Sequence, residues 1–372
     1  MKDDQKRERL FDMVSKIRVA HDAYGEIQRE LEMGYESVGF TPVPVCLLVT
    51  GETRTGKSCV VREMLRQHAA RESESGDIKS VVYAVAPPSA TLKGLLEALL
   101  KGLGDPLWSR GTVSNMTERL YVLLDKVSCR MIVLDEFQHL WPEGRKAGAT
   151  VLSDWVKVLV EPGRWGIVAV GLPRSAAIIH THRQLVSRFR PALRLPLFDW
   201  RVESSRLQFR GVLKGFRKQL APFEFPVLES SELAYRMYLA TAGRIGLIAA
   251  LLDRAVKEAV WDKRMGISIE HLQRAYERSI WMAPHFPVSG GPFLAKFQDI
   301  AANQIPDAIR TMAEADVYAD DSGEVQLYGG HALSAAVDAS HSEAVQGDRP
   351  RTRGRVTQRA KSGRGRSLRE IL

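Results

Sequence analysis

Short apolar runs alternate with amphipathic helical stretches through the first half of the chain. The apolar runs have the length of buried strands and lie at positions 43–50, 80–85, 129–136, 165–172 and 192–198. The helical stretches separate these runs and lie at positions 57–70, 91–103, 115–127, 148–160 and 174–186. Strands that alternate with helices form a parallel sheet covered on both faces. The pattern therefore predicts an α/β domain over residues 41–198.

The segments before and after this domain have a different pattern. Residues 2–32 are polar with apolar positions at helical spacing, which predicts two helices in an N-terminal region of residues 1–40. The polar segment 71–79 is expected to be a solvated loop. Beyond residue 199 no strand pattern remains, and the amphipathic segments lie at 201–220, 230–242, 244–261 and 268–281. They predict a small α-helical lid domain over residues 199–283.

Positive charge is concentrated at the end of the chain. The formal net charge is +9, and residues 349–372 contribute +8 of it through eight Arg and one Lys against one Glu. A Gly-, Ser- and Arg-rich segment buries too little apolar surface to fold alone, so we expect a disordered basic tail that binds nucleic-acid phosphate. A solubilising tail without a specific partner is the alternative. Residues 284–348 begin with a Pro- and Gly-rich break and are expected to form a flexible linker.

Other features of the composition argue against membrane, secreted and metal-binding classes. The longest apolar stretches are far shorter than the ~20 residues that cross a bilayer. The charged N-terminal segment lacks the apolar run of a signal peptide, so a cytoplasmic protein is expected. Cys46, Cys59 and Cys129 lie in or beside apolar patterns without the spacing of metal ligands, which predicts reduced thiols.

One loop carries a phosphate-binding motif. Residues 51–58 satisfy G-x-x-x-x-G-K-[ST] between an apolar run and a helical stretch, which is the context that a P-loop requires. Backbone N–H groups and the positive end of the next helix would cradle phosphate oxygens. We expect ATP as the cofactor, with Lys57 on the β- and γ-phosphates and Ser58 on Mg²⁺. The nucleotide-binding residues expected here are Gly51, Glu52, Thr53, Arg54, Thr55, Gly56, Lys57, Ser58 and Cys59.

Two carboxylates follow a second apolar run. Residues 131–134 form a buried-strand pattern that ends at Asp135 and Glu136. With a P-loop upstream, this fits a Walker B motif, in which Asp135 holds Mg²⁺ and Glu136 is the catalytic residue that deprotonates the attacking water. Two acids that only cap the next helix are the alternative. His139 senses the γ-phosphate or packs in the core, and we favour packing.

Arg188 and Arg190 precede the last predicted strand. In a doubly wound sheet this position is far from the phosphate site of the same chain but can reach the nucleotide of a neighbouring subunit. A guanidinium there would stabilise the charge of the transition state. From spacing alone, ordinary surface arginines are the simpler interpretation.

Five segments in this order and spacing resemble the TniB/TnsC family of AAA+ transposition ATPases. They are GETRTGKS, VLDEFQHLW, VAVGLPRS, LVSRFRPALRLPLF and TAGRIGLI, and the resemblance covers residues 18–283. The resemblance implies a P-loop AAA+ sheet with flanking helices. It implies a homo-oligomeric ring or filament that assembles with ATP around double-stranded DNA and is dismantled by hydrolysis. The partners implied are a DDE transposase and a TniQ/TnsD-type target selector.

The resemblance also implies roles for particular residues. Arg188 matches the arginine finger, with Arg190 in reserve, and Arg244 is the nearest match to the nucleotide sensor of the lid. Gly171 and Leu172 stand where many AAA+ proteins have a polar residue at the end of the fourth strand, so slow hydrolysis is expected. Arg244 directly follows the first glycine of its segment, whereas many lids place the arginine later.

The same resemblance suggests which residues line a DNA channel. The candidates are cationic or polar residues after the second and third strands, namely Lys93, Lys101, Arg110, Thr112, Arg145 and Lys146. They would contact phosphate without reading sequence. Taken singly, each is equally well explained as an ordinary solvated side chain.

Two other functions fit parts of the sequence. A replication initiator or loader of the Cdc6 type would share the ATPase motifs but normally carries a C-terminal winged-helix domain, for which there is no pattern here. A nucleotide-gated protein-interaction switch with little hydrolysis would explain the missing polar sensor. The basic tail and the Asp135–Glu136 pair favour the transposition ATPase.

Overall fold

The computed structural model describes residues 10–40, 45–73, 76–88, 91–140, 156, 159, 164–181, 183–280, 291–294, 316–319 and 325–328. The chain divides into two compact units, Met1–Asp316 and Val317–Leu372. Within the ranges just given, no helix is long and apolar enough to cross a membrane. The predicted basic tail and most of the predicted linker lie outside the described residues.

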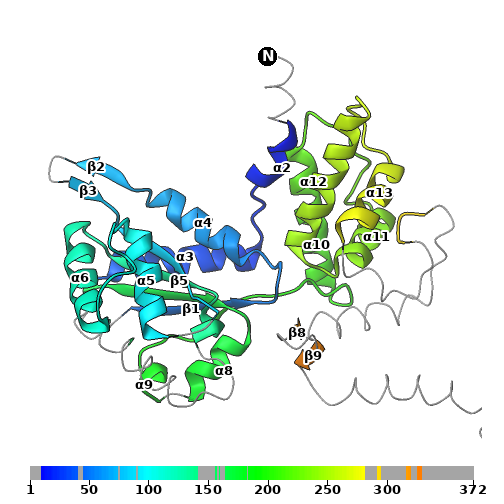
Figure 1. The fold of residues 1–372 in the computed structure, drawn as a ribbon. Coiled ribbons are helices and arrows are strands. Elements are labelled where there is room, and N and C mark those ends of the chain that lie inside the picture. Colours follow the sequence, from blue (N-terminus) through cyan, green and yellow to red (C-terminus); the bar gives the residue numbers. More distant parts are fainter. Residues whose placement is uncertain are drawn as a thin grey trace, which may run out of the picture. The chain divides into compact units, whose positions relative to one another are not determined.

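Five parallel strands form the central sheet of the first unit (Figure 1). They are β1 (Cys46–Gly51), β4 (Val81–Val85), β5 (Met131–Asp135), β6 (Gly166–Gly171) and β7 (Leu193–Leu195). The strand order is β4-β5-β6-β1-β7, so β6 lies between the two strands that carry the predicted nucleotide motifs. Because all strands run the same way, their carboxyl ends meet at one edge of the sheet and their amino ends at the other.

Both faces of the sheet are buried under helices. Successive side chains of a strand point to opposite faces, and in β1 the side chains of Cys46 and Leu48 enter one hydrophobic core while those of Leu47 and Val49 enter another. The first core is completed by α5 (Leu92–Leu103), α6 (Val113–Lys126), α8 (Arg174–Thr181) and α9 (Arg183–Val186), and the second by α3 (Asp22–Ser37) and α4 (Lys57–Gln67). The predicted α/β sheet with helices on both faces is confirmed.

Four helices form a bundle after the sheet. They are α10 (Glu203–Gln219), α11 (Ser231–Thr241), α12 (Ile245–Trp261) and α13 (Ile269–Ser279), one in each of the predicted amphipathic segments. Serine side chains cap two of them, since Ser230 accepts from the N–H of Leu233 and Ser268 from that of His271. The N-terminal helix α2 (Met13–Lys16) adds Val14 to the hydrophobic core of the bundle, whereas α3 packs on the sheet.

Two short pairs of strands contradict the sequence interpretation. The segment predicted as a solvated loop contains β2 (Arg71–Ser73) and β3 (Gly76–Ile78), which pair antiparallel. Strands β8 (Asp316–Ala319) and β9 (Val325–Tyr328) form a separate two-stranded sheet in the stretch where no strand was predicted. Strands of three or four residues are too short to establish an apolar alternation, so the pattern missed both pairs.

One predicted helix falls largely outside the described residues. Of positions 148–160, the structure describes Val156 and Leu159, and both are helical and buried. Their side chains belong to the same hydrophobic core as α5 and α6. The apolar spacing that predicted this helix therefore agrees with the burial of these two residues.

Candidate nucleotide-binding site

The loop between β1 and α4 is folded around its own lysine. Lys57 Nζ donates to the carbonyl oxygens of Gly51 at 2.6 Å and Glu52 at 2.8 Å. Gly56 has φ 107°, and no side chain caps α4. An uncapped helix N-terminus presents its first N–H groups to an anion. The ammonium and the helix end thus create a positive site at the carboxyl end of β1.

The remaining residues of the loop differ in exposure. Thr55 is buried and its hydroxyl donates to the carbonyl of Glu52 at 2.8 Å, which closes the loop on itself. Thr53, Arg54 and Ser58 are exposed and Cys59 is half-buried. The nine predicted nucleotide-binding residues of this motif therefore lie together at the carboxyl edge of the sheet.

Asp135 ends β5 as a buried carboxylate held on both oxygens. Oδ1 accepts the N–H of Glu136 at 2.9 Å, and Oδ2 accepts the hydroxyl of Tyr83 at 3.1 Å. Burial raises the pKa of the Asp135 carboxyl, and the charge of Lys57 opposes this shift. Burial and the neighbouring Asp135 raise the pKa of Tyr83 to about 12. Tyr83 is thus a neutral donor that orients the carboxylate, and the sequence analysis did not single it out.

These groups fit a magnesium ion bound to a nucleotide. A carboxylate oxygen and a serine hydroxyl are hard oxygen ligands of the kind that Mg²⁺ prefers, with phosphate oxygens completing its shell. Asp135 at the end of β5 and Ser58 in the first turn of α4 supply this donor set. The raised pKa of Asp135 is the sign of a buried anion that an added cation would stabilise.

Glu136 occupies a strained turn directly after β5. Its φ is 53°, in the left-handed region that residues other than glycine rarely adopt. The side-chain amide of Gln138 donates to one oxygen of the Glu136 carboxylate. The oxygen of the same amide accepts the N–H of Leu172 at 3.0 Å. No role was predicted for Gln138 from the sequence, because its contact with Leu172 depends on β6 lying beside β5.

His139 lies in the same short helical turn, η1 (Phe137–Leu140). It is half-buried, and its Nδ1 lies 3.4 Å from the carbonyl oxygen of Ala86. This contact holds the turn against the segment that follows β4. The arrangement agrees with a packing role for His139.

Arg244 connects the helical bundle to the phosphate-binding loop. It is 2% exposed, and its Nη1 donates to the carbonyl of Thr53 at 3.0 Å and to the Thr53 hydroxyl at 2.6 Å. Two residues later, the N–H of Gly246 donates to the carbonyl of Arg54 at 2.7 Å. The arginine predicted as the lid sensor therefore reaches the P-loop although it directly follows a glycine.

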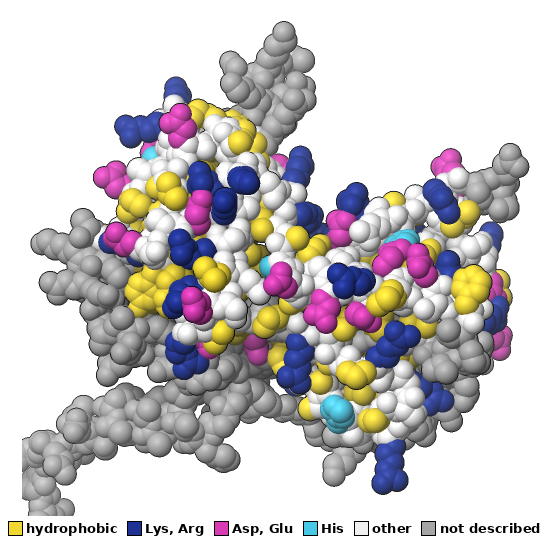
Figure 2. Space-filling model, turned by 180° about the vertical axis from the view of Figure 1, so that it is seen from behind, with side chains coloured by type: hydrophobic (Ala, Val, Ile, Leu, Met, Phe, Trp, Pro, Cys, Tyr) yellow, Lys and Arg dark blue, Asp and Glu magenta, His cyan; other side chains and the backbone are white. Residues whose placement is uncertain are grey.

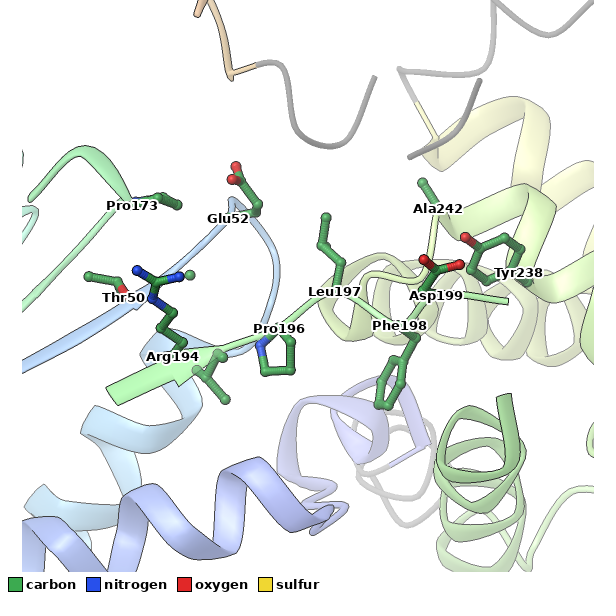
Figure 3. A pocket seen from close by; sticks show the side chains of 12 residues that line it. Thr50, Glu52, Pro173, Arg194, Pro196, Leu197, Phe198, Asp199, Tyr238 and Ala242 are labelled. Carbon is green, nitrogen blue, oxygen red and sulfur yellow. The ribbon is translucent and has the colours of Figure 1, made fainter. Parts of the chain in front are cut away.

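A cavity of about 440 Å³ opens beside the loop (Figure 3). Thr50, Gly51 and Glu52 line one end, and Tyr238 and Ala242 of the bundle line the other. Its remaining wall is formed by Pro173 and residues 194–199. Arg194 pairs with Thr50 across β7 and β1, and Figure 3 shows its side chain extending beside Thr50. Arg194 was not predicted from the sequence, because strand register and not spacing brings it to the carboxyl edge.

The predicted arginine finger lies at the opposite edge. Phe189 bridges to Cys46, the first residue of β1, and the N–H of Arg190 donates to the carbonyl of Cys46 at 3.0 Å. Burial raises the pKa of the Cys46 thiol to about 12, and the neighbouring charge of Arg188 opposes this shift. Strand β1 has six residues, so its two ends lie about 17 Å apart at about 3.3 Å per residue. Arg188 and Arg190 are therefore remote from the P-loop of their own chain.

The predicted DNA-contact residues that the structure describes lie in two separate positions. Lys101, Arg110 and Thr112 lie in and beside the α5–α6 loop, where Lys101 Nζ lies 5.4 Å from the ring centroid of Trp108. Lys93 lies at the other end of α5, about 12 Å away along the helix axis. Thr112 is also the N-cap of α6, because its hydroxyl accepts the N–H of Asn115 at 3.3 Å. Arg145 and Lys146 lie outside the described residues.

An ion pair holds the loop that carries these residues. Arg119 Nε lies 2.6 Å from Oδ2 of Asp105, which is 8% exposed, and Arg119 Nη2 donates to the carbonyls of Leu107 and Arg110. The loop is therefore preformed. On the face drawn in Figure 2, Lys and Arg side chains are interspersed with Asp and Glu and do not form one broad basic patch.

Comparison with known proteins gives a family. The family model described as "Bacterial TniB protein" matches residues 9–201, which is more than half of the chain. The chain belongs to the TniB family. No curated protein matches the sequence. The resemblance noted from the motifs is thus confirmed for this family.

The solved structures similar to this TniB-family chain share its fold. Cdc6p from Pyrobaculum aerophilum is 15% identical with a TM-score of 0.53, covering 73% of this chain and 71% of that chain. The Aeropyrum pernix ORC1 protein, solved in complex with DNA, is 18% identical with a TM-score of 0.53, covering 72% and 68%. The ADP form of the Aeropyrum pernix ORC2 protein is 16% identical with a TM-score of 0.53, covering 75% and 74%. The predicted P-loop AAA+ fold with a helical domain after the sheet is confirmed.

Proposed function

We propose that this TniB-family protein binds and hydrolyses ATP to control its own assembly on double-stranded DNA during transposition. One observation carries the proposal: Lys57, the Asp135–Glu136 turn and Arg244 reach one site from three separate parts of the fold. A P-loop that only bound a phosphate group would not need an acidic pair or an arginine from the helical bundle. The convergence is what a nucleotide hydrolase requires.

Each of these side chains has a chemical task in the proposed reaction. In hydrolysis, a water oxygen would bond to the γ-phosphorus while the β–γ phosphoanhydride bond breaks and ADP leaves, and Mg²⁺ would neutralise phosphate charge. Lys57 would bind the β- and γ-phosphates, while Ser58 and Asp135 would hold the metal. Glu136 orients the attacking water and accepts its proton. Arg244 lies where it can link the position of the helical domain to the state of the loop.

The position of Arg188 favours catalysis between subunits. A guanidinium at the amino edge cannot reach a nucleotide bound at the carboxyl edge of the same sheet, about 17 Å away. In a ring or helical filament of identical chains, the amino edge of one copy can face the nucleotide of the next. Arg188 would then stabilise transition-state charge in trans, with Arg190 as the second candidate. Hydrolysis would loosen the interface and dismantle the assembly.

The DNA contact is proposed for the α5–α6 loop and the basic tail. The Arg119–Asp105 pair holds the loop in one conformation, so Lys101, Arg110 and Thr112 are presented together without an ordering cost on binding. Residues before Arg349 carry a net charge of only +1. Apart from the tail, a single copy therefore has little net attraction for duplex phosphate, and an assembly that repeats the loop along the duplex multiplies the contacts. Membership of the TniB family supports a DDE transposase and a TniQ/TnsD-type selector as partners.

Replacing the proposed base tests the function. Glu136→Gln keeps the shape of the side chain but cannot accept a proton, so ATP binding should persist while turnover falls at least about 100-fold. Protein assembled on DNA with ATP should then outlast the wild-type assembly. Phosphate release and the lifetime of DNA-bound particles are the two measurements. Glu118→Gln, at an exposed glutamate of α6, is the matched control, and normal turnover in Glu136→Gln would reject the proposal.

A further inference from the structure

Gln138 links the turn after β5 to the end of β6. Its side chain is buried, at 2% exposure, and makes two contacts at opposite ends of one amide. Nε2 donates to Oε2 of Glu136, and Oε1 accepts the N–H of Leu172 at 3.0 Å. Leu172 is the residue directly after β6. The amide therefore connects the proposed base to a backbone group of the neighbouring strand.

The chemistry of its partners fixes which way the amide faces. A backbone N–H can only donate, so the group that meets Leu172 must be the carbonyl oxygen of Gln138. An ionised carboxylate can only accept, so the group that meets Glu136 must be the NH₂. Both requirements are satisfied by one orientation. The contact with Leu172 thus holds the donor of Gln138 against the carboxylate of Glu136.

The position of the Gln138 amide also explains why residue 171 is a glycine. A Cβ added at this position would lie 2.4 Å from Ser175 Oγ and 2.6 Å from Gln138 Oε1, both closer than real contacts allow. The end of β6 therefore has no room for the polar side chain whose absence the sequence analysis noted. The space is occupied by the amide of Gln138, which arrives from the turn after the adjacent strand.

The carboxylate of Glu136 needs a hydrogen bond that fixes its orientation. Its backbone lies in the left-handed region, and the bond from Gln138 is the hydrogen bond that the described residues make to its carboxylate. A carboxylate has about four acceptor positions. With Oε2 held by Gln138, Oε1 keeps its acceptor positions for a water molecule. A base anchored on one oxygen is better oriented than one free to rotate.

We propose that Gln138 is the positioning residue for Glu136, and that it supplies from the turn after β5 the polar group that the end of β6 lacks. This inference rests on the proposed ATPase function. The absence of a polar residue at the end of β6 then no longer favours a switch with little hydrolysis, because Gln138 supplies the polar group from the turn after β5.

Substitution of Gln138 should affect turnover and not nucleotide binding. Gln138→Leu keeps a buried side chain of similar size but lacks the amide, so we expect kcat to fall about 100-fold through misplacement of the base. The Kd for ATP and the KM should change less than about 2-fold, because neither Gln138 contact involves the P-loop. A loss of packing alone would instead lower thermal stability and weaken ATP binding together.

A second substitution should displace the same amide without replacing Gln138. Gly171→Ala should push the amide from its position and lower kcat as Gln138→Leu does, and the two substitutions combined should cost no more than either alone. Ser175→Ala removes the other atom that crowds Gly171 without touching Gln138, and it should retain normal turnover. Gln138→Leu should also add nothing in the Glu136→Gln background.

The outcomes separate this inference from the proposed function. Normal or increased kcat in Gln138→Leu, with turnover lost in Glu136→Gln, would overturn the role of Gln138 and leave the ATPase intact. Full additivity of Gln138→Leu and Gly171→Ala would also overturn it. If Glu136→Gln itself hydrolysed ATP normally, the proposed function and the positioning role would both be wrong.

Discussion

The two edges of the central sheet are built differently. At the carboxyl edge, separate hydrogen bonds join Lys57 to the end of β1, β4 to β5, two residues of the turn after β5 to each other, and the helical bundle to the P-loop. At the amino edge, Arg188 lies beside the start of β1, remote from all of these groups. Under the proposed function, the carboxyl edge would hold the nucleotide and activate water, and the amino edge would supply Arg188 to a neighbouring copy. The difference between the edges thus predicts a catalytic site divided between two copies of the chain.

The largest effect on ligand binding should come from removing the cation of the carboxyl edge. Lys57→Ala eliminates the ammonium that the loop holds through the carbonyls of Gly51 and Glu52. We expect ATP affinity to fall at least about 100-fold, because charge-assisted contacts to phosphate are lost, and nucleotide-dependent assembly on DNA to disappear. Nucleotide titration with a fluorescent ATP analogue measures this. Lys126→Ala, at an exposed lysine of α6, is the control. Unchanged affinity in Lys57→Ala would show that the carboxyl edge does not bind the phosphates of ATP.

A smaller effect is expected where the helical bundle meets the same edge. Arg244→Ala removes two hydrogen bonds to Thr53, and bonds from a charged donor contribute about 1.5–3 kcal/mol each before compensation. We expect ATP affinity to fall about 10-fold, which corresponds to about 1.4 kcal/mol. Thr53→Ala keeps the carbonyl and loses only the hydroxyl, so its effect should be smaller. If Arg244→Ala bound ATP as tightly as the wild-type protein, the bundle would contribute nothing to ATP binding through Arg244.

The smallest effect should come from the tail, which belongs to neither edge. Deleting residues 349–372 removes +8 of charge. If these residues contact duplex phosphate, the deletion should lower DNA affinity and flatten its salt dependence by about 0.9 in the slope of log K against log salt for each phosphate released. The difference in DNA affinity between ATP and ADP should remain, because it originates at the nucleotide. An unaltered slope would show that the tail does not contact DNA, which leaves a protein partner or a solubilising role.

The sequence was sufficient for the sheet and for the nucleotide motifs. Apolar runs of strand length located all five strands, since buried parallel strands are apolar on both faces, as Cys46, Leu47, Leu48 and Val49 show. The P-loop and the Asp135–Glu136 pair were found because each lies in a local motif. Both strand pairs that were missed are short, and their residues show no regular alternation of apolar and polar positions.

The residues that support the site could not be predicted in the same way. Gln138 meets Glu136 nearby in sequence, but its other partner, Leu172, comes from a different strand that lies beside β5. Arg194 reaches the cavity through its register with Thr50. Such contacts depend on which strands are neighbours, and no local pattern encodes that order. Gly171 appeared as a departure from a motif because the side chain that fills its place lies 33 positions earlier in the sequence.

If the site is divided between two copies as proposed, mixed assemblies should behave in a specific way. Arg188→Ala subunits retain the carboxyl edge, including Glu136, and should bind ATP but hydrolyse it about 1000-fold more slowly, the usual loss for an arginine finger. Glu136→Gln subunits retain Arg188 and lack the base. Arg183→Ala, at an exposed arginine of α9, is the control for the first substitution and should hydrolyse ATP normally.

The most direct test is phosphate release from an equal mixture of Arg188→Ala and Glu136→Gln proteins on DNA with ATP. Both variants should bind nucleotide, so both should enter the same assembly. The site is complete wherever an Arg188→Ala subunit, which keeps Glu136, receives Arg188 from a neighbouring Glu136→Gln subunit. With random mixing this holds at about a quarter of the interfaces, so about a quarter of the wild-type rate should return. A mixture that co-assembles, as shown by energy transfer between labelled subunits, but stays inactive would contradict the shared site.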